Sequence, residues 1–196
     1  MLQIRIHGRG GQGVVTAAEM LSIAAFEQGR YAQAFPSFGS ERTGAPVVAF
    51  CRIDEHEIRL REPILAPDVL IIQDPTLLHQ VDVFQGLPAE GYVLINSKRS
   101  FDELGLADIA RRNRHDRLLT VPATEIALKH LGRPLPNAVL LGGFAALSGL
   151  VSLDAVAHAI RVKFRGKVAE GNVAAATEAH EMVAREMEEM IHAQAD

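Results

Sequence analysis

The chain has 196 residues, with 20 lysines and arginines against 24 aspartates and glutamates, and a formal net charge of −4 at pH 7. With 48% hydrophobic and 22% charged residues it has the composition of a folded globular protein, which excludes a disordered tail. Its slight acidity argues against a nucleic-acid binder, and its single cysteine, Cys51, excludes a disulfide framework or a metal or iron–sulfur site held by several cysteines of this chain.

Short apolar runs and helical patterns alternate along the first two thirds of the chain. Alternating polar and apolar residues predict a strand over residues 2–7, and apolar residues at helical spacing predict a helix over about residues 12–28. Compact apolar runs predict further strands at residues 47–53, 69–73, 92–96 and 118–121. Runs without polar alternation are typical of a parallel sheet that is covered on both faces.

The last third of the chain has a helical pattern. It predicts helices at residues 124–131, 137–150 and 153–164, and a long final helix from about residue 168. We therefore expect an α/β fold: a single layered domain over residues 1–196 with a mainly parallel sheet flanked by helices, a Rossmann-like start and a helical C-terminal part. Residues 30–46 are the least regular segment.

No segment of the sequence is typical of a membrane or export signal. The most apolar stretch, residues 138–151, is shorter than the roughly 18–20 residues of a membrane span, and the N-terminus lacks the apolar core of a signal peptide. We expect a cytoplasmic protein that does not associate with a membrane.

A glycine-rich segment follows the first predicted strand and opens the first predicted helix. It reads Gly8, Arg9, Gly10, Gly11, Gln12 and Gly13 and matches the pattern G-x-G-x-x-G. Glycines let an anion approach the backbone, the helix N-terminus supplies free N–H groups, and Arg9 would add a charged contact. The alternative is a tight strand-to-helix connection that binds no ligand.

A dinucleotide site also needs an acidic residue about 20 positions further on, where it holds the ribose. The corresponding region, residues 31–36, contains no acid. This departure argues against an NAD or FAD domain.

A second unusual segment lies at residues 36–46. It combines an acid, a base, three hydroxyl groups, one aromatic ring and two glycine hinges, and its polar centre is Ser40, Glu41, Arg42 and Thr43. Such a loop can present charged groups at the edge of a rigid scaffold. The alternative is a solvated turn with a weak local ion pair.

Together, the segments 8–15 and 36–46 resemble the gamma subunit of 2-oxoacid:ferredoxin oxidoreductases, of which the pyruvate enzyme is the nearest. The resemblance continues through residues 70–74, 137–142, 164–167 and Asn172, so that it spans nearly the whole chain. Thr43 departs from the family pattern, which often has a second arginine there.

The resemblance implies a subunit that is not active alone. Such complexes oxidatively decarboxylate a 2-oxoacid on thiamine diphosphate with magnesium, pass electrons through iron–sulfur clusters to ferredoxin or an NAD-linked subunit, and transfer the acyl group to coenzyme A. The thiamine diphosphate and the clusters are expected on the alpha, beta and delta-type partner subunits. This chain is expected to support assembly and to form part of the coenzyme A site.

The site hypothesis assigns coenzyme A to the two loops. It places Gly8, Arg9, Gly10, Gly11, Gln12 and Gly13 together with Ser40, Glu41, Arg42 and Thr43 near the bound cofactor. Two alternatives remain open: a stand-alone nucleotide-binding module, and a structural scaffold that touches no ligand. No catalytic residue and no metal ligand is assigned to this chain, because its eight histidines lack paired spacing and Cys51 lies in an apolar run.

Overall fold

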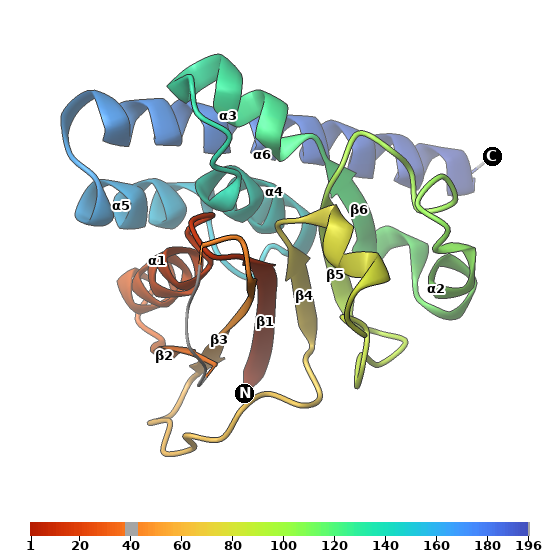
Figure 1. The fold of residues 1–196 in the computed structure, drawn as a ribbon, viewed down its shortest axis with the longest axis horizontal. Helices are drawn as coiled ribbons and strands as arrows, with labels where there is room; N and C mark the ends of the chain where they lie inside the picture. Colours follow the sequence, from red (N-terminus) through yellow and green to blue (C-terminus); the bar gives the residue numbers. More distant parts are fainter. Residues whose placement is uncertain (38–42, 196) are drawn as a thin grey trace.

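The computed structural model describes residues 1–37 and 43–195 and contains a six-stranded sheet with the order β2-β3-β1-β4-β5-β6 (Figure 1). Its strands are β1 (Leu2–Arg9), β2 (Tyr31–Pro36), β3 (Pro46–Asp54), β4 (Val69–Ile72), β5 (Tyr92–Asn96) and β6 (Leu118–Val121). β1, β4, β5 and β6 pair in parallel, whereas β3 is antiparallel to both of its neighbours. The expected mainly parallel α/β fold is confirmed.

The strand β4 is apolar throughout because both faces of the sheet are covered there. All four residues of β4 are fully buried: Val69 and Ile71 face the larger core, and Leu70 and Ile72 face the smaller one. This is the period-two geometry of a strand in a three-layer arrangement.

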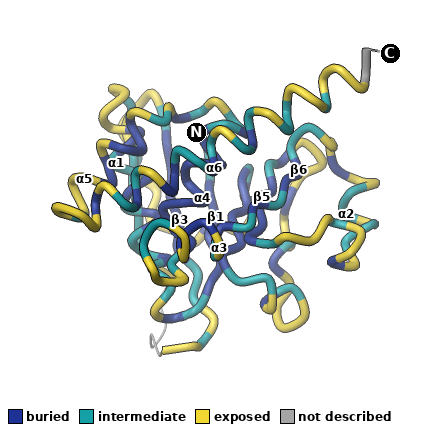
Figure 2. Tube along the Cα trace, turned by 90° about the horizontal axis from the view of Figure 1, so that it is seen from above, coloured by how far each residue is buried: buried dark blue, intermediate teal, exposed yellow. Residues whose placement is uncertain are grey.

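Five helices cover one face of the sheet (Figures 1 and 2). They are α1 (Val14–Glu27), α3 (Ala123–Leu131), α4 (Asn137–Ser148), α5 (Leu153–Lys163) and α6 (Gly166–Ala195). α4 is apolar on all sides because it lies between the sheet and α6. α6 runs along the whole length of this helical layer.

Short elements cover the other face. They are η1 (Pro75–His79), α2 (Ala107–Arg112) and η2 (His115–Arg117), joined by irregular segments. Leu77 and Leu104 pack against Leu70 and Ile72 in the smaller core. Under β1 the cover is polar, because the buried Arg5 donates hydrogen bonds to the carbonyl oxygens of residues 64, 83 and 85.

Besides the short helices η1 and η2, one strand and one α-helix were not expected from the sequence. Residues 31–36, which belong to the segment read as least regular, form the edge strand β2, and residues 107–112 form α2. Neither shows a clear apolar period: β2 is only half-buried at the sheet edge, and α2 has no buried residue. None of the described helices combines the length and apolar character that a membrane crossing requires.

Candidate functional site

The glycine-rich segment lies at the carboxyl ends of the parallel strands. Gly8 and Arg9 still belong to β1, where they pair with Val47 and Pro46, so the turn proper starts at Gly10. Helix α1 then begins at Val14 with Gly13 as its N-cap. Among the described residues no side chain caps this N-terminus, and the first turn contains no acid. Its backbone N–H groups are therefore free to meet an anion.

The glycines of this turn serve different purposes. A Cβ atom at Gly8 would lie 2.6 Å from Val14 Cγ2, and one at Gly13 would lie 2.4 Å from Asn137 Nδ2. Gly13 also has a φ of 71°, in the left-handed region. Close packing therefore explains both glycines. At Gly11, with a φ of 92°, no described atom lies within 4 Å of the Cβ position, so this part of the turn faces open space.

Arg9 binds groups of its own chain. Its Nε lies 3.2 Å from Asp74 Oδ2, and its Nη1 donates to the carbonyl oxygen of Gly44 at 3.0 Å. Its Nη2 donates to Thr76 Oγ1 at 2.7 Å and to Gln80 Oε1 at 2.9 Å. The guanidinium therefore holds the glycine turn to the start of η1, and these contacts use most of the donors that an anion would need.

Asp74 is the acceptor on which this arrangement depends. Burial alone would raise the pKa of its carboxyl group, but hydrogen bonds from Thr76 and Gln12 and the charge of Arg9 outweigh it, and the pKa lies below its ordinary value. Gln12 completes the turn: its Nε2 donates to Asp74 Oδ2 at 2.8 Å, and its Oε1 accepts from the backbone N–H of Arg9 at 2.8 Å.

The second predicted segment reaches the glycine turn. Gly10 donates its N–H to the carbonyl oxygen of Ala45 at 2.9 Å, and Gly44 donates to the carbonyl oxygen of Gly10 at 3.0 Å. Thr43 forms a β-bridge with Gly10. Ser40, Glu41 and Arg42 lie outside the described residues. The structure thus brings the turn and the described end of the second segment together.

The turn stands at a topological switch point. The chain leaves β1 towards α1 on one face of the sheet and leaves β4 towards η1 on the other, so the adjacent ends of β1 and β4 have the connectivity of a switch point. In a dinucleotide-binding fold the second strand pairs directly with the first. Here β3 lies between β1 and β2, a further departure from that class.

Gln73 lies at this switch point, and the sequence predicted no role for it. It follows β4 directly, it is 1% exposed, and among the described residues neither its Oε1 nor its Nε2 has a hydrogen-bond partner. Its Oε1 is 3.1 Å from the Cβ position of Gly8. A buried amide without partners is costly, and sites of this kind are often functional. Its place directly after a strand at the switch point is the signal that would have found it.

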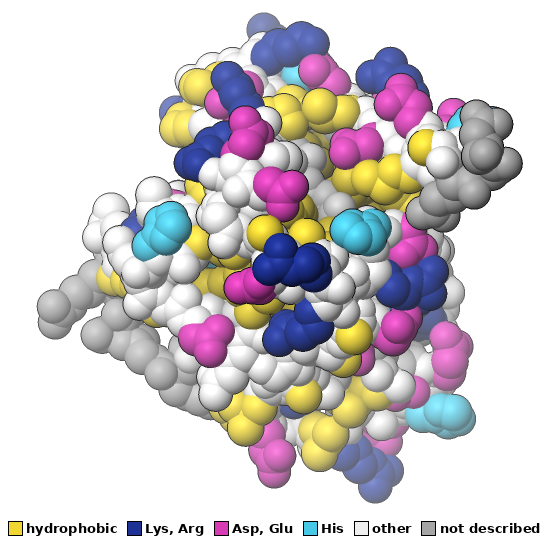
Figure 3. Space-filling model, turned by 90° about the vertical axis from the view of Figure 1, so that its right-hand side faces the viewer, with side chains coloured by type: hydrophobic (Ala, Val, Ile, Leu, Met, Phe, Trp, Pro, Cys, Tyr) yellow, Lys and Arg dark blue, Asp and Glu magenta, His cyan; other side chains and the backbone are white. Residues whose placement is uncertain are grey.

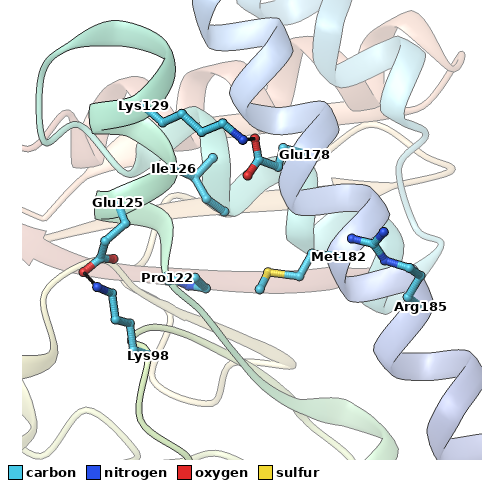
Figure 4. Close-up of a pocket in the computed structure, with 8 residues that line it drawn as sticks. All are labelled: Lys98, Pro122, Glu125, Ile126, Lys129, Glu178, Met182 and Arg185. Carbon is cyan, nitrogen blue, oxygen red and sulfur yellow. Dashed lines mark hydrogen bonds and ion pairs between the residues drawn. The ribbon is translucent and has the colours of Figure 1, made fainter.

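A separate hollow lies between α3 and α6 (Figure 4). It has a volume of about 340 Å³ and an apolar floor that includes Ile126 and Met182. Its rim charges are largely paired: Lys98 with Glu125 at 3.0 Å and Lys129 with Glu178 at 2.7 Å. None of the predicted site residues lines it.

The described residues contain no cluster of three or more histidine, cysteine or acidic side chains suited to a metal ion. Cys51 is fully buried, and burial raises the pKa of its thiol to about 12. A single protonated thiol does not fit the ligand set of an iron–sulfur cluster, which needs several thiolates.

Comparisons with known proteins agree with this architecture. The family model described as pyruvate ferredoxin/flavodoxin oxidoreductase matches residues 3–182. The chain belongs to this family. It is 49% identical over 181 residues to the common gamma subunit of the pyruvate/ketoisovalerate oxidoreductases of Pyrococcus abyssi, covering 92% of this chain and 96% of that protein. The expectation of a gamma-type subunit is confirmed.

Solved structures extend the comparison. The pyruvate oxidoreductase subunit PORC of Thermotoga maritima superposes with a TM-score of 0.76 at 36% identity, covering 92% of this chain and 95% of that one. A chain of the 2-oxoglutarate:ferredoxin oxidoreductase of Magnetococcus marinus, solved with 2-oxoglutarate, coenzyme A and succinyl-CoA bound, shares the fold with a TM-score of 0.69 at 18% identity. That match covers 94% of this chain and 31% of the other.

Proposed function

We propose that this gamma-type subunit forms part of the coenzyme A site in a cytoplasmic complex that oxidatively decarboxylates a 2-oxoacid to an acyl-CoA. Thiamine diphosphate, magnesium and the iron–sulfur clusters are held by alpha, beta and delta-type partners, and the electrons pass to ferredoxin or to an NAD-linked subunit. The glycine turn and the segment 40–43 contact the cofactor, and the rest of the chain supports assembly.

The observation that carries this proposal is the uncapped N-terminus of α1 at the switch point, beside Thr43 and with open space at Gly11. Coenzyme A carries several phosphates, and a helix N-terminus with free N–H groups favours them. The enzyme of Magnetococcus marinus, part of which shares this fold, has coenzyme A bound. The buried and unpartnered Gln73 amide lies under the same turn.

In this proposal the arginines have different tasks. Arg9 positions the turn through Asp74, Thr76 and Gln80. Arg42 supplies the direct charge, because it lies one residue before Thr43, which is bridged to Gly10.

The test is the KM for coenzyme A in the assembled complex. Arg42→Ala removes one charge-assisted hydrogen bond and is expected to raise this KM about tenfold or more, while the KM for the 2-oxoacid stays unchanged. Arg9→Ala is expected to raise it as well, because the turn loses its hold on Asp74. Arg59→Ala, which changes an exposed arginine that pairs with Glu57, is the matched control.

An unchanged KM for coenzyme A in a normally assembled Arg42→Ala complex would contradict the proposal. If the variants of Arg9 and Arg42 together prevent assembly instead, both loops are subunit contacts and not a cofactor site.

A further inference from the structure

A second cleft lies beside the glycine turn, between the α3–α4 connection and the α5–α6 turn. It has a volume of about 390 Å³. Phe164 and Asn172, which line it, belong to segments that carry the family resemblance but have no role in the site described so far. Clefts of this size with apolar walls and a few polar groups are typical of small-molecule sites.

Two buried asparagines supply the polar groups of the cleft. Asn172 is 3% exposed; its Nδ2 donates to the carbonyl oxygen of Val168 at 2.9 Å, and its Oδ1 accepts no hydrogen bond from any described residue. Asn137 is 4% exposed, and its Oδ1 accepts a hydrogen bond from the backbone N–H of Ala138. Each amide therefore keeps hydrogen-bonding capacity for a ligand: an acceptor and an N–H on Asn172, and an N–H on Asn137.

The walls of the cleft are apolar, and its rim is basic. Leu131, Leu135 and Val168 line it together with the ring of Phe164, and Val168 remains 54% exposed to water. Arg133 stands at the rim, and no described acidic residue lines the cleft. The exposed Arg165 and Lys167 flank the first residue of α6, close to Phe164 in the sequence. An aromatic surface within a basic cleft suits a ligand that combines a flat ring with an anion.

Asn137 joins this cleft to the glycine turn. Its Nδ2 lies 3.4 Å from the carbonyl oxygen of Gly13, the N-cap of α1, and it also lines the cleft. The side chain of a single residue therefore separates the cleft from the N-terminus of α1.

We infer that this cleft binds the base of an adenine nucleotide, which lies against Phe164 and is read by the amide of Asn172. A side-chain amide pairs with adenine through one accepted and one donated hydrogen bond, and Asn172 has both groups available. The inference rests on the proposed function, because coenzyme A contains such a nucleotide, and it adds the location and chemistry of the base subsite.

The experiment measures equilibrium binding of adenosine 3′,5′-bisphosphate, the nucleotide part of coenzyme A, to the assembled complex by calorimetry. Asn172→Ala and Phe164→Leu are each expected to weaken binding at least about fivefold, because they remove the amide pair and the aromatic surface. Binding of inorganic pyrophosphate, which has no base, is expected to stay unchanged in both variants. Val162→Ala, an exposed apolar residue of α5 outside the cleft, is the control.

Three outcomes overturn the inference. The first is equal binding of the nucleotide by the wild type and both cleft variants, and the second is no binding of it at millimolar concentration. The third is loss of assembly on Arg133→Glu, which changes an exposed rim residue and would show that a partner chain fills the cleft. The proposed function is judged separately by the KM for coenzyme A of Arg42→Ala, so it can stand when the base subsite fails.

Discussion

His7 is a histidine that the fold keeps uncharged. It lies on β1, where it is 6% exposed, and among the described residues its Nε2 has no hydrogen-bond partner. Burial, and then the charge of Arg5, lowers the pKa of its imidazole to about 3. The unfolded chain titrates near 6.5, so between these two values it binds a proton that the folded chain does not. The free energy of unfolding therefore falls as the pH drops from about 6.5 towards 3.

Replacement of His7 removes this pH dependence. In His7→Leu the free energy of unfolding is expected to depend less steeply on pH between 6.5 and 4.5, by up to about 1.4 kcal/mol per pH unit. Urea denaturation at a series of pH values measures the slope. His192→Gln, an exposed histidine of α6, is expected to keep the wild-type slope. The same slope in His7→Leu and in the wild type would refute the assignment.

At the residue scale the sequence predicts types of group better than their partners. The glycine pattern correctly places a tight turn before α1, because a positive φ and close packing leave few other residues possible. It does not predict that Arg9 is bound by Asp74, Thr76 and Gln80, which lie more than 60 positions further along the chain. Nor does it predict the burial of Gln73, which depends on how β4 meets β1.

Helices α4 and α6 approach each other closely at Gly142. A Cβ atom at Gly142 would lie 2.0 Å from the carbonyl oxygen of Ala176 on α6, so any side chain here pushes the helices apart. At the neighbouring Gly143 the nearest atoms, on Val121, Leu94 and Val183, are 3.4–3.5 Å away, which is ordinary van der Waals contact. Two adjacent glycines of one helix thus have opposite tolerances.

Alanine substitutions at these two positions are expected to have opposite effects. Gly142→Ala lowers the free energy of unfolding by about 1–3 kcal/mol, because overpacking shifts α6. Gly143→Ala leaves it unchanged or raises it by up to about 1 kcal/mol, because alanine is the better helix former and fills available space. Urea denaturation of both variants checks the pair. Equal destabilisation would mean that helix α4 tolerates neither side chain and that the close approach is not the cause.

At the element scale, the buried parallel strands and the long helices follow from the sequence because each buries a continuous apolar surface. β2 could not be predicted in this way, since Ala32 and Ala34 contribute little apolar area and the strand ends at Pro36. The antiparallel direction of β3 could not be predicted either, because an apolar run such as residues 47–53 looks the same in a parallel and in an antiparallel strand.

Over the whole molecule, apolar surface remains open to water. Phe26 and Leu65 are more than 70% exposed, and Ile191 near the end of α6 is 63% exposed. On the face seen in Figure 3, hydrophobic side chains gather in hollows between charged side chains of both signs. Such surfaces suit a subunit of a larger assembly, in which partner chains cover them.

Activity is therefore expected to belong to the complex and not to this chain. Electron transfer from a 2-oxoacid needs clusters, and the single cysteine of this chain, Cys51, is buried with the pKa of its thiol raised to about 12. The purified chain, incubated without oxygen with pyruvate, coenzyme A and methyl viologen, is expected to reduce no viologen. Recombination with the partner subunits is expected to give 2-oxoacid-dependent reduction, which also shows that the chain was folded. Viologen reduction in proportion to the amount of this chain alone would refute the assignment of the redox centres to the partner subunits and would place one on this chain.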